Sequence, residues 1–239
     1  MSKKLNTLGA GSLVKLNENG VAKKFLVLGY NHYGKGEVTL LRKDTFAPRQ
    51  WTGSHDGSYN NCYNGSDMDM FCNVQYPLML DSAIRGCLID VPIPTARGAV
   101  YGSTVDKTVV NLMRHGFLLS AQEATATAGL VAEGSAFTYL SGTQANRIAY
   151  HDGTSTAVYW WLRSPDSSAD IAYFVRTDGA LNGLGVYAAN SGCPRPALTL
   201  SSEILVSNGT DSEGCYTVDD AVIAGEQYQK VNGVWRRMM

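Results

Sequence analysis

Charged side chains are scarce in this sequence. They make up 17% of its 239 residues, and the net charge is −1, whereas an average soluble protein carries about 25% charged residues. A nucleic-acid binder needs a strongly basic face, and a disordered acidic tail needs an excess of carboxylates. The composition argues against both classes, so no nucleic-acid partner is expected.

Long apolar runs are missing as well. Residues 1–11 contain two lysines without the apolar stretch of a secretory signal behind them, and no segment approaches the roughly 18 apolar residues of a membrane span. We therefore expect a soluble protein, made inside a cell, that does not insert into a membrane. A chain of this length buries about 70–75% of its unfolded surface and needs no disulfide or metal to fold.

Cysteine is infrequent, and its spacing fits no metal or redox motif. The cysteines are odd in number and form neither a C-x-x-C motif nor a zinc-ligand spacing with histidine. We expect buried free thiols; a reactive nucleophile stays open, although the sequence offers it no partner. The five cysteines are Cys62, Cys72, Cys87, Cys193 and Cys215.

Catalytic and cofactor-binding motifs are also absent. The sequence contains no G-x-S-x-G elbow, H-E-x-x-H pair, phosphate-binding loop, dinucleotide fingerprint or EF-hand loop. Asp56, Asp67 and Asp69 are oxygen ligands that suit calcium, but acids at a helix start explain them equally well. We predict no enzyme, no catalytic residue, no cofactor and no metal. The scattered histidines are expected in loops or packing positions: His32, His55, His115 and His151.

Small polar residues and tyrosine dominate instead, with 25 Gly and 13 Tyr. Short apolar runs separated by Asn/Gly clusters predict an N-terminal antiparallel meander over Ser12–Leu16, Phe25–Tyr30 and Glu37–Arg42. The polar, turn-rich stretch Arg49–Gly65 predicts a long surface loop.

Capping patterns predict where helices begin. Ser66 followed by Asp69 resembles a capping box, so a helix is expected to start there and to stop before Pro77. A second short helix is expected over Leu78–Arg85.

The clearest helix start is Ser120, with Glu123 three residues later, because the two residues satisfy each other's backbone N–H groups. The alanine-rich segment that follows predicts a helix continuing to Ala132.

Strands return in the second half. Asp178-Gly179 and Asn232-Gly233 are two-residue hairpin signals, and the second one places a small β unit at Ser207–Met239. We predict an α+β fold of two units, residues 1–206 and the appended residues 207–239. The further expected strands are Cys87–Ile93, Val158–Arg163, Ile171–Thr177, Ala180–Tyr187, Pro196–Leu200, Tyr228–Val231 and Val234–Arg237.

Three motifs carry a resemblance to a known family: WWLRSP (160–165), V-x-x-D-G (175–179) and G-x-x-RPAL-x-L (192–200), with VTLLRKD (38–44), Trp51 and FLLSxxE (117–123) before them. Over Leu13 to Val206 the sequence resembles a family of domains of unknown function from phages and Gram-positive gut bacteria. That family is similar to the C-type-lectin fold of formylglycine-generating enzymes and of the variable proteins of diversity-generating retroelements. The usual G-V-R-P-A-L reads G-C-P-R-P-A-L here, which lengthens the loop before the last strand.

The resemblance implies a C-type-lectin-like fold with antiparallel sheets, two or three short helices and a C-terminal β-hairpin appendage. Trp160, Trp161, Leu162 and Arg163 would then be scaffold, and the loops between the signature strands would bind a ligand through rigid Tyr and adaptable Ser, Asn and Asp side chains. Ordinary hairpin loops without a ligand are the alternative. The calcium-dependent sugar motifs E-P-N, Q-P-D and W-N-D are missing. The expected ligand-binding residues are Asp166, Ser167, Ser168, Asp170, Tyr173, Arg176, Asn182, Tyr187 and Asn190.

The function that this resemblance implies is that of a bacteriophage virion protein. It would be exposed on the tail or capsid, assembled in the host cytoplasm, and would attach the particle to a host cell-surface glycan or protein. The terminal KVNGVWRR (230–237) is similar to a hairpin of virion proteins, so other virion proteins and copies of the same chain are expected partners. A purely structural decoration or scaffold subunit is the first alternative. An enzyme similar to formylglycine-generating proteins is the second.

Overall fold

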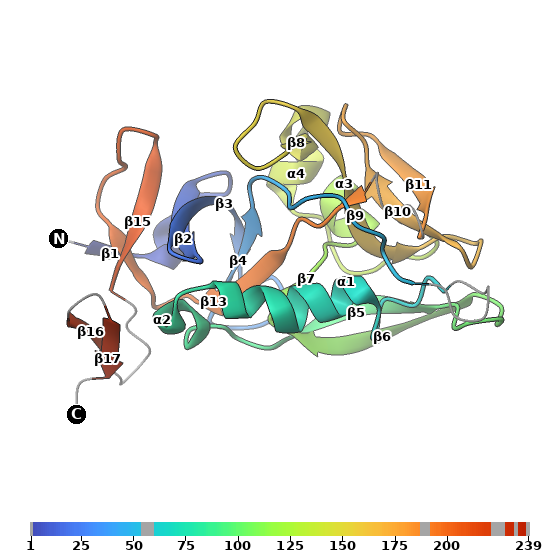
Figure 1. Ribbon diagram of the computed structural model, residues 1–239, viewed down its shortest axis with the longest axis horizontal. Coiled ribbons are helices and arrows are strands. Elements are labelled where there is room, and N and C mark those ends of the chain that lie inside the picture. The colour runs from blue at the N-terminus through green and yellow to red at the C-terminus, as the bar shows by residue number, and fades with distance from the viewer. Residues whose placement is uncertain (1, 54–59, 187–191, 221–227, 232–233, 238–239) are drawn as a thin grey trace.

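The computed structural model describes residues 2–53, 60–186, 192–220, 228–231 and 234–237 (Figure 1). It is rich in β-sheet, and its helices are short, as the α+β prediction requires. None of the helices in these residues is long and apolar enough to cross a membrane.

The largest sheet has eight strands in the order β1-β14-β15-β2-β3-β4-β13-β7. The predicted meander is confirmed, because β2, β3 and β4 pair antiparallel in sequence order. A tight turn joins β2 to β3 through Asn19-Gly20, both with positive φ (49° and 80°), the backbone that matches the twist of a hairpin. The strands are β1 (Ser2–Lys4), β2 (Leu13–Glu18), β3 (Val21–Tyr30), β4 (Glu37–Arg42), β7 (Gly116–Phe117), β13 (Ala197–Ser201), β14 (Leu205–Ser207) and β15 (Cys215–Asp220).

A second sheet contains the WWLRSP motif and the start of the V-x-x-D-G motif. It has the order β11-β10-β9-β12, and β8 pairs with β9 beside this path. The expected hairpin around Asp178-Gly179 is confirmed, since β10 and β11 pair antiparallel across it. The strands are β8 (Ala149–Tyr150), β9 (Ala157–Pro165), β10 (Ile171–Val175), β11 (Leu181–Gly185) and β12 (Gly192–Cys193).

A long two-stranded hairpin lies at the lower rim of the view in Figure 1. It joins β5 (Val91–Gly98) to β6 (Asp106–Arg114) in antiparallel pairing. The strand expected over Cys87–Ile93 is wrong at its start, because regular pairing begins only at Val91 and continues to Gly98. The sequence did not indicate β6, whose residues show no alternation of apolar and polar side chains.

The first helical segment begins as expected. In α1 (Asp67–Met70) the Ser66 hydroxyl accepts a hydrogen bond from the Asp69 N–H. The expected stop before Pro77 is wrong, because the chain continues through a π-helical turn, η2 (Phe71–Gln75), and a 3₁₀ turn, η3 (Tyr76–Met79). A proline early in a helical turn is tolerated, since its missing N–H would have no partner there. The helix expected over Leu78–Arg85 is shorter, as α2 (Ser82–Arg85).

The capping box at Ser120 is confirmed in both directions. The predicted helix length is wrong: α3 (Ala121–Thr125) ends at Ala126, which adopts a left-handed conformation with φ 62°. The segment expected to be helical up to Ala132 is irregular after that residue. The remaining short helices are η1 (Leu5–Thr7), α4 (Thr138–Gly142) and η4 (Gln144–Arg147).

The C-terminal residues divide into two parts. The predicted hairpin is confirmed as β16 (Tyr228–Val231) and β17 (Val234–Arg237), which pair with each other. In contrast, β15 lies inside the large sheet, parallel to β2 and antiparallel to β14. The boundary after residue 206 stays a prediction, but residues 215–220 share a sheet with the N-terminal strands.

Candidate binding surface

The WWLR residues of β9 form part of the core. Trp160, Trp161, Leu162 and Arg163 have no exposed surface. Both indole N–H groups donate to backbone carbonyls, from Trp160 to Arg147 and from Trp161 to Arg49, each at 2.9 Å. The prediction that these four residues are scaffold is therefore confirmed.

Arg163 is the hub of this scaffold. Its guanidinium forms two bonds to the Glu123 carboxylate, at 2.6 and 2.7 Å, two to the Pro94 carbonyl and one to the Leu118 carbonyl. Burial by itself lowers the pKa of Arg163, but the adjacent Glu123 charge and its hydrogen bonds raise it above the ordinary value. One side chain thus joins β5, β9 and the N-terminus of α3.

A second buried carboxylate supports the same junction. Glu133 accepts a hydrogen bond from the Ala96 N–H at 2.7 Å and another from the Ser164 hydroxyl. The Ser164 hydroxyl in turn accepts from the Ala121 N–H at 2.9 Å. Burial raises the pKa of Glu133 above its ordinary value, and the Arg163 charge opposes this rise.

The stretch expected to be a long surface loop, Arg49–Gly65, is largely buried where the structure describes it. Trp51 has no exposed surface, and its indole N–H donates to the Leu162 carbonyl at 3.0 Å. The Tyr63 hydroxyl is also buried and accepts from the Leu118 N–H at 3.0 Å. The surface-loop prediction is therefore wrong for these residues, because their polar groups bond to the backbone of other elements.

Asn61 fastens the turn between β9 and β10. Its amide nitrogen lies 2.9–3.1 Å from the carbonyl oxygens of Asp166, Ser168 and Ile171. Its amide oxygen accepts from the Ala99 N–H at 2.7 Å, at the end of β5. The β9–β10 turn and the β5–β6 hairpin are thus held together through one buried side chain.

A glycine makes this close approach feasible. Gly98 has φ +69°, and a Cβ atom there would lie 2.6 Å from the backbone oxygen of Asn61. Any larger residue would therefore displace Asn61 in addition to straining the backbone.

Five of the predicted ligand-binding residues lie together around this fastened turn. Asp166 accepts hydrogen bonds from the Ser167 hydroxyl at 3.0 Å and from the Ser168 N–H at 3.2 Å. Ser167 and Ser168 are exposed, whereas Asp170 and Tyr173 are half-buried. Burial raises the pKa of Tyr173, and the Asp166 carboxylate raises it further.

The other predicted residues do not join this group. Arg176 is exposed at the opposite end of β10, 3.7 Å from the Asp178 carboxylate. Asn182 pairs with Phe174, so its side chain lies on the other face of the hairpin from that of Tyr173. Tyr187 and Asn190 lie outside the described residues.

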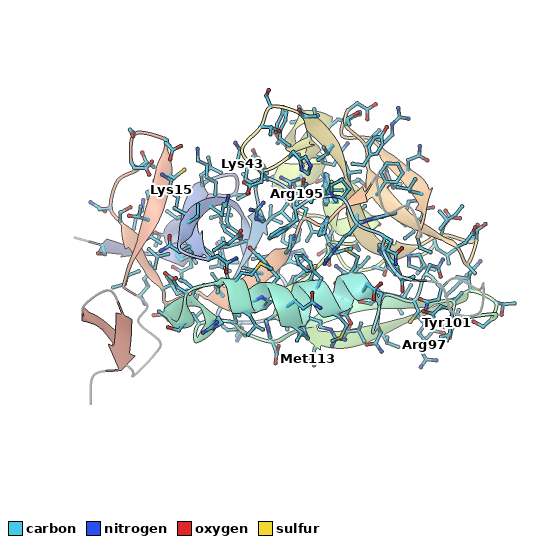
Figure 2. All side chains as sticks on the ribbon, in the orientation of Figure 1. Lys15, Lys43, Arg97, Tyr101, Met113 and Arg195 are labelled. Atoms are coloured by element: carbon cyan, nitrogen blue, oxygen red, sulfur yellow. The ribbon has the colours of Figure 1, made fainter. Side chains whose placement is uncertain are left out.

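A cavity of about 700 Å³, which no sequence motif indicated, lies at the β5–β6 hairpin. It lies between the β5–β6 hairpin and residues 62–64, and half-buried Val110 and Leu112 form its apolar part. Arg97 and Asp106, 3.4 Å apart, stand at its polar end. Figure 2 shows Arg97 and Tyr101 at this end of the molecule. The remaining lining residues are Cys62, Asn64, Thr95, Ala96, Gly98, Val100, Ser103, Thr104 and Asn111.

The acids considered for calcium have other roles where they are described. Arg114 donates two hydrogen bonds of 2.8 Å to the Asp69 carboxylate, and Asp67 accepts from the Gly53 N–H at 3.0 Å. Asp56 and His55 lie outside the described residues. In the part of the chain that the structure describes, no three His, Cys, Asp or Glu residues come together as a metal site.

The cysteines are free thiols, four of them buried and Cys62 half-buried, as the spacing predicted. Burial raises the pKa of each one, that of Cys87 to about 11. A catalytic cysteine needs a lowered pKa to be a thiolate at neutral pH. The electrostatics of these five thiols therefore disfavour nucleophilic chemistry.

The sequence matches one known protein family. No curated protein and no solved structure matches the chain. Residues 36–202, which contain β4, the β5–β6 hairpin, α3, all of the second sheet and β13, match the family described as Domain of unknown function (DUF6273). The chain therefore belongs to the DUF6273 family.

Proposed function

We propose that this chain is a non-catalytic recognition domain of C-type-lectin-like architecture, exposed on a phage virion, that attaches the particle to its host surface. The observation that carries this proposal is the contrast between the buried residues around Arg163 and the polar turn that follows them in the chain. The signature residues are buried and fully bonded, while the polar turn at residues 166–170, which Asn61 fastens, exposes Ser167 and Ser168. A rigid frame that presents an adaptable polar surface is the usual design of a recognition site.

The cavity at the β5–β6 hairpin, which Asn61 joins to the turn at residues 166–170, is the second part of the proposed binding surface. Its volume falls within the range of small-ligand sites, about 300–1,000 Å³. Apolar Val110 and Leu112 combine with polar Arg97, Ser103 and Asp106 in its lining. This mixture suits one unit of a host surface glycan or one side chain of a host surface protein, held by hydrogen bonds and apolar contact.

Two other functions agree less well with the structure. An enzyme similar to formylglycine-generating proteins needs an activated cysteine, and burial raises the pKa of all five thiols. A purely structural virion subunit needs no ligand cavity, so the cavity at the β5–β6 hairpin favours recognition over that role.

Binding of the full chain to bacterial cells tests the proposal. The labelled protein is titrated onto a panel of Gram-positive gut bacteria and onto their purified surface polysaccharides and proteins. Saturable binding to at least one strain is expected. Thr104→Trp, at the cavity, and Ser168→Trp, at the exposed turn, should each weaken it at least tenfold.

The matched control is Glu203→Trp. The Glu203 side chain is 39% exposed just before β14, where it pairs with Lys4 of β1, so the same bulky substitution there should leave binding unchanged. Absence of saturable binding to every strain and fraction would refute the recognition function. Binding that is equally strong in Thr104→Trp and Ser168→Trp would refute the surface assigned to it.

A further inference from the structure

The β5–β6 hairpin has one covered edge and one open edge. On the covered side, the Pro94 carbonyl accepts from Arg163 of β9, and the Ala96 N–H donates to Glu133. The backbone groups of these even-numbered residues of β5 therefore point away from β6. The odd-numbered residues Ile93 and Thr95 therefore exchange hydrogen bonds with their partners in β6, Leu112 and Val110.

The alternation fixes which groups of β6 face outward. Since Leu112 and Val110 bond to β5, the backbone N–H and C=O groups of Val109, Asn111 and Met113 point to the other side. No strand in the described part of the chain pairs with that side. The Met113 carbonyl accepts from the Arg114 guanidinium at 2.8 Å.

Two features that can prevent strands from pairing, a lysine and a bulge, are confined to the start of β6, at Lys107 and at the register shift beyond Ala96. The strand runs over nine residues without proline, and its register with β5 is regular from Val91 to Ala96. Val109 and Met113 are 40% and 53% exposed, and Figure 2 shows Met113 at the outer rim of the molecule. Long, apolar, unpaired edges are templates for a further strand.

We propose that β6 pairs antiparallel with β6 of a second copy of this chain, in a two-fold register centred on Asn111. In this register Val109 lies opposite Met113 of the partner on one face, and Val110 lies opposite Leu112 of the partner on the other. The outward-facing backbone groups of Val109, Asn111 and Met113 then face their counterparts, as a hydrogen-bonded antiparallel ladder requires. The two hairpins become one four-stranded sheet.

The charges at the ends of the strand agree with the same register. Lys107 is exposed and has no hydrogen bond or ion pair with any described residue. The position opposite it in the second copy is that of His115, whose ring is 2.7 Å from the Asp90 carboxylate, itself 59% exposed. Lys107 of each copy therefore approaches the exposed Asp90 carboxylate of the other copy, and the two-fold symmetry makes this contact twice.

Sedimentation of the full chain across micromolar concentrations tests the interface and its register. The wild-type protein is expected to be a dimer. Val109→Lys with Met113→Lys places like charges opposite each other at both contacts, and this double variant should be monomeric. Val109→Lys with Met113→Glu places opposite charges there, so it should dimerise within about tenfold of the wild-type Kd.

A single proline substitution tests whether dimerisation depends on the outer edge of β6 and not on the stability of the β5–β6 hairpin. Asn111→Pro removes an outward N–H and leaves the bonds to β5 intact, so it should give a monomer whose thermal unfolding midpoint matches that of the monomeric charge variant. A monomeric wild-type protein, or a dimer that persists in the Val109→Lys, Met113→Lys variant, would overturn the interface. A monomeric Val109→Lys, Met113→Glu variant would overturn the register centred on Asn111.

Discussion

Replacing Arg163 with methionine should destabilise the protein far more than any surface substitution. All five guanidinium N–H bonds are made inside the protein, and neither Arg163 nor Glu123 has exposed surface. Methionine leaves the Glu123 carboxylate buried without its cation, and breaking a buried pair in this way costs about 3–5 kcal/mol. Since domains are stable by about 5–15 kcal/mol, the loss is a large fraction of the total.

The assay is equilibrium unfolding in urea, with a double-mutant cycle. Glu123→Gln alone should also destabilise, because it leaves the Arg163 cation without a carboxylate. In the Arg163→Met background, however, Glu123→Gln should restore stability, so the two changes are coupled by about 2 kcal/mol or more. Arg176→Met is the control, since that side chain is 47% exposed and 3.7 Å from its partner, and it should cost less than about 0.5 kcal/mol. A loss below about 1 kcal/mol for Arg163→Met, or additive effects in the cycle, would refute the role given to this pair.

Three further predictions concern single positions. Gly192→Ala should lower the free energy of unfolding in urea by about 3 kcal/mol, the upper end for an overpacked core, because the new Cβ would lie 2.1 Å from the Trp161 ring. Gly209→Ala is the control and should be neutral, since a Cβ there has no atom within 4 Å; equal effects of the two substitutions would contradict this packing. Burial raises the pKa of Glu133, so its folded state favours the protonated form and its contribution to stability falls as the pH rises from its unfolded pKa through the folded one. The stability of Glu133→Gln relative to wild type should therefore rise as the pH rises above the ordinary glutamate pKa, and a relative stability that falls with rising pH would contradict the raised pKa. Cys62, the half-buried thiol, should be alkylated first by iodoacetamide in the native protein, as peptide mass spectrometry would show; prior labelling of a buried cysteine would contradict the observed burial.

Local signals explain what the sequence predicted well. The Ser120 capping box and the Asp178-Gly179 turn each depend on residues only a few positions apart, so their structure follows from short-range sterics and hydrogen bonding. The length of α3 did not follow, because Ala126 takes the left-handed conformation, where the chain turns away to reach Glu133 and the junction with β5. Alanine propensity carries no information about such a long-range constraint.

The site was harder to predict than the fold. Trp51 and Asn61 sit in a polar, turn-rich stretch that reads as surface, yet their hydrogen bonds go to Leu162 and to the β9–β10 turn, about a hundred residues away. The cavity depends on β6, which shows no apolar/polar alternation because apolar residues lie on both of its faces, Val109 and Met113 on one and Val110 and Leu112 on the other. Of the predicted ligand-binding residues that the structure describes, only those from Asp166 to Tyr173 lie together. The order of residues along a loop does not show on which face of the hairpin each side chain lies, so the sequence could not separate them from Arg176 and Asn182.

The parallel pairing of β15 with β2 has a consequence for synthesis. Cys215 lies beside Leu13, about 200 residues earlier in the chain, so a ribosome releases one strand long before its neighbour exists. Before β15 is synthesised, β2 is unpaired along one edge, and Lys15 lacks both of its carboxylate partners, Asp211 and Glu213. Closure of the large sheet must come late, and non-local pairing of this kind slows folding. For the same reason, residues 36–202 expressed alone would lack β2 and β3 and would leave the fully buried strand β4 bare along one side.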